Sequence, residues 1–397
     1  MRSSRTWVAA AIVVVLAAVA AAAALASTGG GTAPKKPIII GAAVDLTNQM
    51  KPYDSAALLA AKLRAGATKV NGRPFKFIQC NTQLDPAKTK ACADELISKG
   101  AIALLVTCDV QYAAAATTEA INAGKLALGS CIGTDEQGPK LFGNKGKLAF
   151  SFGNLAQDEG AAMANYAYKV KHWKKAITVT DDLLLYFRDV VKAFTARYQA
   201  LGGKIVDAEH FKSFQNQTPN VVNHIRSVRG AQVIVTANAF EPGPLVQGLR
   251  TLHVNTPILN SWAGDGTSWW PKSPKVTKYW FVTFASIFGD DPNPAVRKLE
   301  KAMKARGAAP ATGSFVTGAT AIDALATAIK RAHGSTKPAV LANQFIRFHN
   351  LRTISGKISF SSKFHTVFGR SYRVIEVENN KGKYVGSIKA GHPANIG

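Results

Sequence analysis

The chain has 397 residues and combines a strong positive charge with an apolar composition. Its 49 lysine and arginine residues exceed its 24 aspartate and glutamate residues, so the formal net charge is +25, while 47% of all residues are hydrophobic and 18% are charged. This composition excludes disorder as the main state, and at roughly 100–200 residues per domain it predicts two or three packed domains. After the first thirty residues no apolar run approaches the ~20 residues that cross a bilayer, which excludes a multispanning transporter or channel.

The N-terminus has the pattern of an export signal. Arg2 and Arg5 precede an unbroken apolar stretch over residues 7–26, which ends in a small-x-small cleavage pattern. Because this stretch is also long enough to span a bilayer, residues 1–26 are either a cleaved signal peptide or a retained N-terminal membrane anchor. Residues 27–37 are small, polar and interrupted by proline, which predicts a flexible linker. Both alternatives place the folded part in the periplasm or on the outer face of the cytoplasmic membrane or cell wall.

The four cysteines indicate two disulfides, because an even number of cysteines in an exported protein favours cross-links. Cys80 ends an apolar strand and Cys92 lies on the helix that follows it, so we expect these two to pair. Cys108 and Cys131 each follow a buried strand and would meet at the same edge of one sheet. The alternative is four buried free thiols. No Cys-x-x-Cys motif and no histidine pair at ligand spacing occurs, so we expect no metal site.

From residue 38 onward, short apolar strands alternate with amphipathic helices. Apolar strands with intervening helices predict parallel sheets covered on both faces, built from right-handed βαβ units, and therefore a doubly wound α/β fold. The expected strands are residues 38–44, 75–80, 101–107, 125–130, 176–180, 204–208, 231–237 and 257–260. The expected helices are residues 55–70, 85–99, 113–123, 158–170, 186–201, 219–229 and 241–252.

Two Rossmann-like lobes are expected, because a loop-rich zone at residues 133–153 separates two blocks of four strands each. Past Phe281 the pattern becomes helix-rich and then strand-rich, which indicates that the chain returns to both lobes. Ligands of such sheets bind beyond the carboxyl ends of the strands, so two lobes that face each other there form a cleft. The expected boundaries are 38–153 plus about 286–360 for lobe 1, and 154–285 plus about 361–392 for lobe 2.

Four short motifs carry a family resemblance. They are Gly41-Ala42-Ala43-Val44-Asp45-Leu46-Thr47, Asp85-Pro86-Ala87-Lys88-Thr89, Asp182-x-x-x-Tyr186 and Phe240-Glu241-Pro242-Gly243. With the order of elements, they resemble the leucine/isoleucine/valine-binding family of type I periplasmic binding proteins over nearly the whole chain from residue 38. The resemblance implies two lobes joined by a hinge around a ligand cleft. It also implies an extracytoplasmic, monomeric protein without a cofactor, which captures a small solute by hinge closure and delivers it to the membrane permease of an ABC importer.

The resemblance also implies ligand contacts in the first lobe. Tyr53 matches a cleft aromatic of the family. The loop after the third expected strand stands where the family places a serine and backbone amides on the ligand carboxylate, so Gln111 or Tyr112 would replace that serine. The next loop, which contains Ile132, corresponds to a second carboxylate loop, and Thr134 could supply a hydroxyl there. Each of these residues could instead be an ordinary packed or solvated loop residue.

In the second lobe, Tyr186 matches the family tyrosine after the fifth strand, and Asn238 lies near a position where the family often has an aromatic. Trp262 stands approximately where the amino-acid binders carry a glutamate for the ligand ammonium, and Asp265 follows three residues later. Because a buried cation without an acidic partner costs several kcal/mol, we expect leucine, isoleucine and valine to bind weakly or not at all. A flat tryptophan face favours an aromatic or apolar carboxylate, or a related amide.

Other classes of function are less favoured. No Gly-x-Ser-x-Gly, His-Glu-x-x-His or phosphate-loop motif occurs, so we do not expect an enzyme. Asp181 and Asp182 form an adjacent acidic pair that we expect to cap the following helix. Lysine and arginine are spread through the helices, so no nucleic acid is expected, although a basic surface is compatible with peripheral contact to anionic membrane or wall polymers. A ligand-sensing envelope receptor of the same fold remains the alternative.

Overall fold

The computed structural model describes residues 35–391. The expected signal peptide or anchor at residues 1–26 lies outside the described residues, as does most of the expected linker. The described residues from Pro37 onward form one compact unit, and its first strand begins at Ile38. Within this described part, none of the helices is long and apolar enough to cross a membrane.

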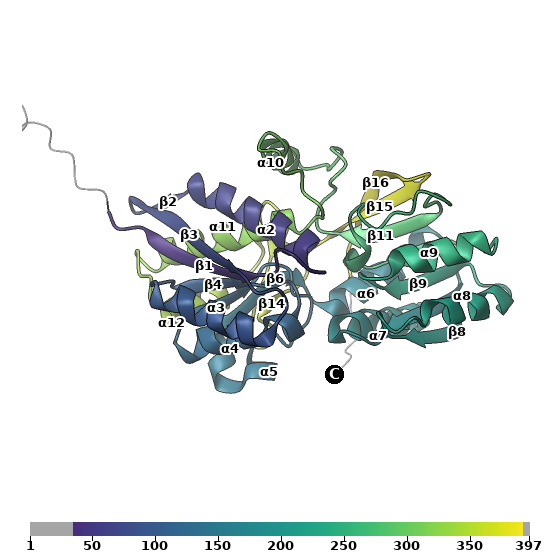
Figure 1. The fold of residues 1–397 in the computed structure, drawn as a ribbon, viewed down its shortest axis with the longest axis horizontal. Coiled ribbons are helices and arrows are strands. Elements are labelled where there is room, and N and C mark those ends of the chain that lie inside the picture. Colours follow the sequence, from purple (N-terminus) through teal and green to yellow (C-terminus); the bar gives the residue numbers. More distant parts are fainter. Residues whose placement is uncertain (1–34, 392–397) are drawn as a thin grey trace, which may run out of the picture. The chain divides into compact units, whose positions relative to one another are not determined.

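The first lobe is built on a seven-stranded sheet (Figure 1). Its N-terminal elements are β1 (Ile38–Val44), α2 (Lys51–Gly66), β2 (Lys69–Val70), β3 (Arg73–Asn81), α3 (Pro86–Ser98), β4 (Ala103–Val106), α4 (Val110–Asn122), β5 (Leu126–Gly129), α5 (Pro139–Phe142), η1 (Gly143–Leu148) and β6 (Ala149–Asn154). Later elements are α10 (Pro294–Lys304), α11 (Phe315–Arg331), α12 (Pro338–Phe345), β12 (Leu351–Thr353), β13 (Gly356–Ile358) and β14 (Thr366–Val367). The strand order is β14-β6-β5-β4-β1-β3-β2, and every pair is parallel except β2 with β3.

Alternation of side chains along the strands gives this sheet two apolar faces. In β4, Ala103 and Leu105 pack with α2, α11 and α12, whereas Leu104 and Val106 pack with α3 and α4. Successive side chains of a strand point to opposite faces, so a wholly apolar strand needs helices on both sides. The first lobe therefore has the three-layer arrangement that the sequence predicts.

The second lobe is built on another seven-stranded sheet. Its elements are α6 (Ala156–Asn165), η2 (Tyr166–Val170), β7 (Lys175–Asp181), α7 (Leu185–Ala200), β8 (Lys204–Phe211), α8 (Thr218–Ser227), β9 (Val233–Ala237), α9 (Pro242–Thr251), β10 (Ile258–Asn260), η3 (Trp262–Gly264), β11 (Tyr279–Thr283), β15 (Tyr372–Glu378) and β16 (Lys381–Ile388). The order is β16-β15-β11-β10-β9-β7-β8. Strands β7 to β11 pair in parallel, and β15 and β16 add antiparallel pairs at the edge.

The chain passes between the lobes three times, and here the structure differs from the expected boundaries. The zone expected to be loop, residues 133–153, ends in β6, which pairs with β5. The sequence does not indicate this strand, because a segment rich in lysine and glycine precedes it instead of a long helix. β14 pairs with β6, so the first sheet extends to Val367 instead of ending near residue 360. A strand of two residues leaves no periodic pattern in the sequence.

Both expected disulfides are present. Cys80 at the end of β3 pairs with Cys92 on α3, with Cα atoms 5.9 Å apart. Cys108 and Cys131 join the loops after β4 and β5, with Cα atoms 4.8 Å apart. The second bridge therefore ties together two neighbouring loops at the carboxyl ends of the first sheet.

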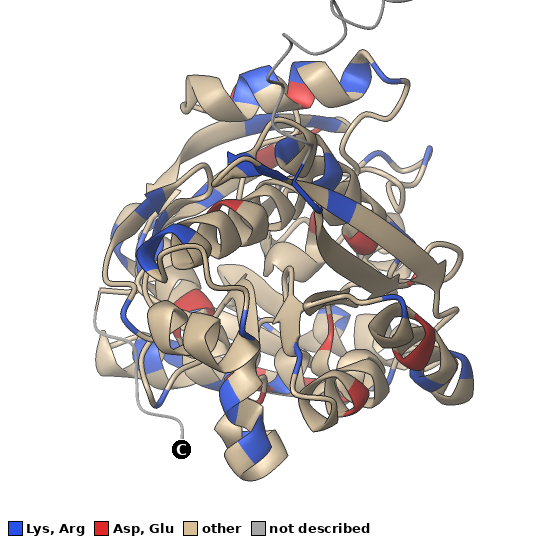
Figure 2. Cartoon of the chain, turned by 90° about the vertical axis from the view of Figure 1, so that its left-hand side faces the viewer, with Lys and Arg blue, Asp and Glu red and all other residues tan. Residues whose placement is uncertain are grey.

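The excess positive charge is spread over the surface. Figure 2 shows lysine and arginine on helices, strands and loops of the face toward the viewer, with acidic residues between them. Several basic side chains form exposed ion pairs, such as Lys90 with Asp94 and Lys99 with Glu95. Exposed pairs of this kind contribute about 0–1 kcal/mol each to stability.

Candidate ligand-binding site

Loops at the carboxyl ends of strands from both sheets line one pocket between the lobes. The first lobe contributes the start of α2 and the loop after β4, and the second lobe contributes the loops after β7, β9 and β10. The cavity has a volume of about 20 Å³, which is room for roughly one water molecule. Its lining residues are Met50, Tyr53, Cys108, Asp109, Leu184, Tyr186, Phe187, Ala239, Phe240, Trp262 and Ala263.

Trp262 lies at the centre of an aromatic group in this pocket. Its ring centroid is 5.1 Å from that of Tyr53, 6.0 Å from that of Tyr186 and 5.2 Å from that of Phe284. The side chain is 3% exposed, and its Nε1–H donates to no acceptor in the described part of the chain. Trp262 therefore gives the pocket wall an apolar ring, and its buried N–H is left without a protein acceptor in the described part of the chain.

Direct contacts across the pocket hold the two lobes together. The Tyr53 hydroxyl donates to the Ala263 carbonyl at 2.5 Å, and the Leu185 N–H donates to Gln111 Oε1 at 2.7 Å. Gly133 of the first lobe packs against the ring of Tyr186, so closely that a Cβ atom there would lie 2.6 Å from the ring. These contacts define a closed arrangement, and an organic ligand larger than water enters only when the lobes separate.

Glu159 on α6 organises the second-lobe side of the pocket. It is fully buried, and its carboxylate accepts hydrogen bonds from the Trp262 backbone N–H at 2.7 Å and the Tyr186 hydroxyl at 2.9 Å. Burial raises its pKa to about 8, although the hydrogen bonds oppose the shift. Glu159 thus fixes the positions of two lining aromatics. Sequence reasoning missed it, although an adjacent acidic pair at positions 158 and 159 in an otherwise apolar helix is a signal for a buried polar role.

Asp54 and Asp109 shape the first-lobe side. Asp54 is buried and accepts hydrogen bonds from the Asp45 N–H at 2.8 Å and the Cys108 N–H at 2.9 Å, so it links α2 to the loop after β4. Asp109 caps α4, because its Oδ1 accepts from the Gln111 N–H at 2.8 Å. Burial raises the pKa of Asp54 to about 7 and that of Asp109 to about 6.

Of the expected ligand residues, Tyr53, Tyr186 and Trp262 are brought together in the pocket. The other expected first-lobe residues lie around it instead of lining it. Gln111 bridges the lobes by accepting the hydrogen bond from the Leu185 N–H. Tyr112 is partly buried against the apolar cluster that also contains Tyr53 and Trp262. Ile132 packs inside the first lobe with Val106. Thr134 is fully buried, and its carbonyl accepts from the Thr366 hydroxyl at 2.6 Å.

Asn238 and Asp265 support second-lobe loops. Asn238 Oδ1 accepts from the N–H groups of Phe240 at 3.1 Å and Glu241 at 2.9 Å, and so shapes the loop that carries Phe240. Asp265 accepts from the Thr283 hydroxyl and from the Gly313 N–H, both at 2.6 Å. Burial raises its pKa to about 6. Both side chains hold the backbone near the pocket, and neither is among the lining residues.

Buried polar contacts also join the segments that cross between the lobes. Arg373 at the start of β15 pairs with Asp291 in the segment after β11, with 3.2 Å between Nε and Oδ2. The Gly369 N–H in the third crossing donates to Asp158 at the start of α6, at 2.5 Å. Removing one partner of a buried ion pair is strongly destabilising, so the contact between Arg373 and Asp291 holds the crossing segments together.

The expected capping role of Asp181 and Asp182 is wrong. Helix α7 begins at Leu185, and its N-cap residue, Leu184, makes no side-chain cap. Asp181 instead accepts from the N–H and hydroxyl of Ser213, and Asp182 contacts His210. The helix starts within one residue of its expected position, and Asp181 and Asp182 lie four and three residues before its first residue, which is too far to cap it.

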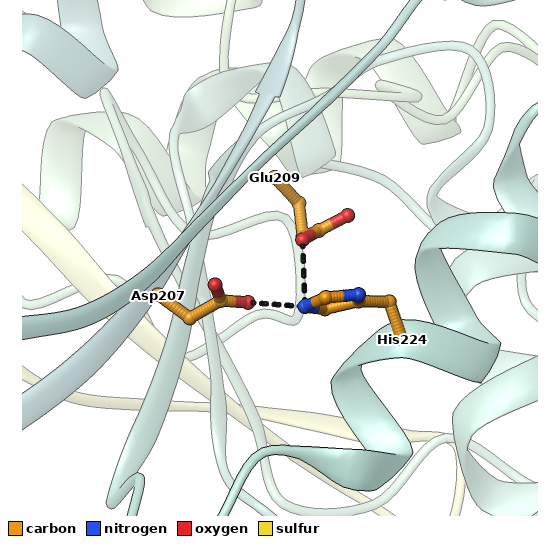
Figure 3. Close-up of side chains that lie close together, drawn as sticks. All are labelled: Asp207, Glu209 and His224. Carbon is orange, nitrogen blue, oxygen red and sulfur yellow. Dashed lines mark ion pairs between the residues drawn. The ribbon is translucent and has the colours of Figure 1, made fainter.

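One cluster elsewhere could hold a metal ion. Asp207 and Glu209 on β8 point toward His224 on α8 (Figure 3). His224 Nε2 lies 3.5 Å from Asp207 Oδ2 and 3.4 Å from Glu209 Oε1, and the side chains are 55%, 22% and 18% exposed, respectively. Contacts of His224 with the two carboxylates account for this geometry as well as a divalent cation does. None of the three residues lines the pocket.

Two α/β lobes whose strand-end loops meet around one pocket form the architecture of a bilobal ligand-binding protein. The chain belongs to the periplasmic binding protein family, because the family model matches residues 37–383. This confirms the family resemblance and the expected fold. No curated protein matches the sequence.

Solved structures share the fold. LivJ, a branched-chain amino acid transporter substrate-binding protein from Streptococcus pneumoniae in complex with isoleucine, is 17% identical, with a TM-score of 0.76 over 89% of this chain and 99% of that one. The leucine-binding protein LivK from Thermotoga maritima is 18% identical, with a TM-score of 0.76 over 88% and 98%. An ABC transporter solute-binding protein from R. palustris in complex with benzoate is 18% identical, with a TM-score of 0.72 over 90% and 97%.

Proposed function

We propose that this protein is an extracytoplasmic solute-binding protein that captures a small organic ligand by lobe closure and delivers it to an ABC importer. The observation that carries the proposal is the pocket itself. Residues of both lobes line it, and the hydrogen bonds Tyr53 to Ala263 and Leu185 to Gln111 close it. Because the cavity has room for about one water molecule, the liganded form holds the lobes further apart than this structure does, and the ligand stabilises that form by its higher affinity for it. Binding, rather than turnover, is therefore the proposed activity.

The lining indicates the body of the ligand. Tyr186, Phe187, Phe240 and Trp262 present aromatic surface, with Tyr53 facing them from the first lobe. Such surfaces favour an aromatic ring or a branched apolar chain. The sequence-based expectation is an aromatic or apolar carboxylate or a related amide, with leucine, isoleucine and valine binding weakly. The benzoate complex of the R. palustris neighbour supports a ligand with an aromatic body.

A ligand panel tests capture. Amino acids, aromatic acids, amides and amines are screened by thermal unfolding, because a ligand that binds only the folded state raises the unfolding temperature by mass action. Each hit is then titrated by calorimetry and measured by small-angle scattering. We expect at least one saturable hit that reduces the radius of gyration. Hits that leave the radius unchanged contradict hinge closure, and a panel without hits contradicts solute binding.

Delivery is tested separately from capture. Membranes that contain a candidate ABC permease are incubated with the purified protein, with and without its ligand. We expect the liganded form to associate more strongly and to stimulate ATP hydrolysis. A protein that binds its ligand and instead associates with a signalling protein of the membrane contradicts the importer role while retaining the binding role.

A further inference from the structure

The first-lobe side of the pocket already holds a negative charge. Asp109 lines the pocket and is only 4% exposed. Its Oδ1 accepts hydrogen bonds from the Gln111 N–H at 2.8 Å and the Tyr112 N–H at 3.3 Å, in the first turn of α4. These are the backbone donors that a helix N-terminus otherwise offers to an anion. The protein's own carboxylate therefore occupies the place where a ligand carboxylate would be stabilised.

The pocket has nothing to neutralise a second carboxylate. Among its described lining residues there is no lysine, arginine or histidine, although the whole chain carries a net charge of +25. A ligand carboxylate would lie close to the Asp109 carboxylate, and two like charges in a dry space repel strongly, because little water screens them. A ligand that brings its own carboxylate is therefore disfavoured.

The remaining polar groups favour a nitrogen-containing ligand. Asp109 is a hydrogen-bond acceptor and attracts an N–H or ammonium group. The buried Trp262 Nε1–H is an unused donor that a ligand carbonyl would satisfy. The faces of Tyr53, Tyr186 and Trp262 suit an apolar body, and they also attract a cation placed over a ring.

We infer that the ligand of this pocket carries a hydrogen-bond-donating nitrogen, as an amide or an ammonium group, on an aromatic or branched apolar body, and that it has no free carboxylate. This inference rests on the proposed solute-binding function. Of the ligands that the sequence suggests, the inference favours the amide and excludes the carboxylate.

The test uses sets of ligands that differ only in this group. Benzoate, benzamide and benzylamine form one set, and isovalerate, isovaleramide and isopentylamine form the other. We expect the wild-type protein to bind the amide or the amine of a set at least tenfold more tightly than the carboxylate, measured by calorimetry at pH 7.5. The tighter of the amide and the amine shows whether a neutral or a cationic nitrogen is preferred.

A variant tests whether Asp109 causes the preference. Asp109→Asn keeps the side-chain oxygen that caps α4 and removes the charge, so its helix remains capped. We expect the preference against the carboxylate to fall at least tenfold in this variant. Asp85→Asn is the matched control, because Asp85 caps α3 through the Lys88 N–H, is exposed and does not line the pocket. It should leave all six affinities unchanged.

The outcomes separate the two proposals. A carboxylate that binds the wild-type protein within tenfold of its amide and amine counterparts overturns the inference and leaves solute binding intact. A preference against the carboxylate that stays the same in Asp109→Asn also overturns the inference and leaves solute binding intact. If no member of these sets binds, the best hit of the broader panel decides, and a hit with a free carboxylate overturns the inference. If no compound binds at all, the proposed function itself fails.

Discussion

The two sides of the pocket are built differently. On the first-lobe side, the Cys108–Cys131 bridge joins the two loops, while Asp54 and Asp109 satisfy backbone N–H groups of the same lobe. On the second-lobe side, aromatic rings dominate, and a single buried carboxylate, Glu159, holds two of them in place. The first side is cross-linked and charged, and its carboxylates accept hydrogen bonds from backbone N–H groups of the same lobe. The second side offers apolar area and an unused donor.

This difference separates selectivity from affinity. Apolar area supplies most of the favourable free energy of ligand binding, and well-placed polar groups decide which ligand is accepted. The aromatic side can therefore bind many small apolar compounds. The charged and rigid side then rejects those that carry the wrong polar group. Four experiments test this difference between the two sides.

The largest effect should come from removing the central aromatic. Trp262→Ala removes a buried indole that contacts three other rings, so we expect a loss of about 3–5 kcal/mol in the free energy of unfolding and loss of ligand binding. Urea unfolding and calorimetry measure the two effects. The control is Trp270→Ala, because Trp270 is partly buried against the α8 and α9 side of the second lobe and outside the pocket. Full ligand affinity in Trp262→Ala would place the site elsewhere.

The next effect distinguishes the two disulfides. Replacing either pair by alanine releases a constraint on the unfolded chain and should lower the free energy of unfolding by about 3 kcal/mol. Removing Cys108–Cys131 should also weaken ligand binding, because Cys108 lines the pocket. Removing Cys80–Cys92 should leave the affinity unchanged, since that bridge joins β3 to α3. Equal affinity losses in both variants would contradict a special role for the first-lobe loops.

A methyl group can test the contact between the two sides. In Gly133→Ala the new Cβ would lie 2.6 Å from the Tyr186 ring, so closure should become less favourable by about 1–3 kcal/mol. We expect weaker ligand binding and a larger radius of gyration in the presence of ligand. In Gly66→Ala, the control at the end of α2, the Cβ meets nothing within 4 Å. If Gly133→Ala binds and compacts as the wild type does, the lobes do not close through this contact.

The last effect concerns pH. Burial raises the pKa of Glu159 from its ordinary 4.5 to about 8, so the folded protein retains a proton that the unfolded chain releases. The associated stability is fully present below about pH 4.5 and is lost as the pH rises through 8. Glu159→Gln should therefore reduce the fall in stability between pH 5 and 8, by up to about 1.4 kcal/mol per pH unit.

The measurement is urea unfolding of both proteins across this range. Asp54 shifts in the same direction, with a pKa raised to about 7, so part of the slope should persist in the variant. Identical slopes in the two proteins would show that Glu159 is ionised in the folded state.

The sequence alone predicts most of the strands and helices up to residue 260, the two lobes and the pairing of the cysteines, but not β6 or β14. Apolar strands such as residues 38–44 alternate with amphipathic helices, and this local pattern requires helices on both faces of a parallel sheet. The order of strands then places Cys108 and Cys131 at one edge, and this inference needs only neighbours in the chain and the general rules of parallel sheets. The expectation that Tyr53, Tyr186 and Trp262 share a ligand site came from the family resemblance, and the structure brings the three together.

Only the tertiary structure decided the chemistry of the pocket. Glu159 lies 103 residues before Trp262 in the sequence, and nothing local indicates that the carboxylate of one accepts the N–H of the other. The same is true of β14, whose two residues become a strand only beside β6. Asp109 could be recognised as a cap from the sequence, but its burial in a pocket without a cation could not. Charge selectivity depends on which groups are desolvated together, and desolvation is a property of the packed lobes.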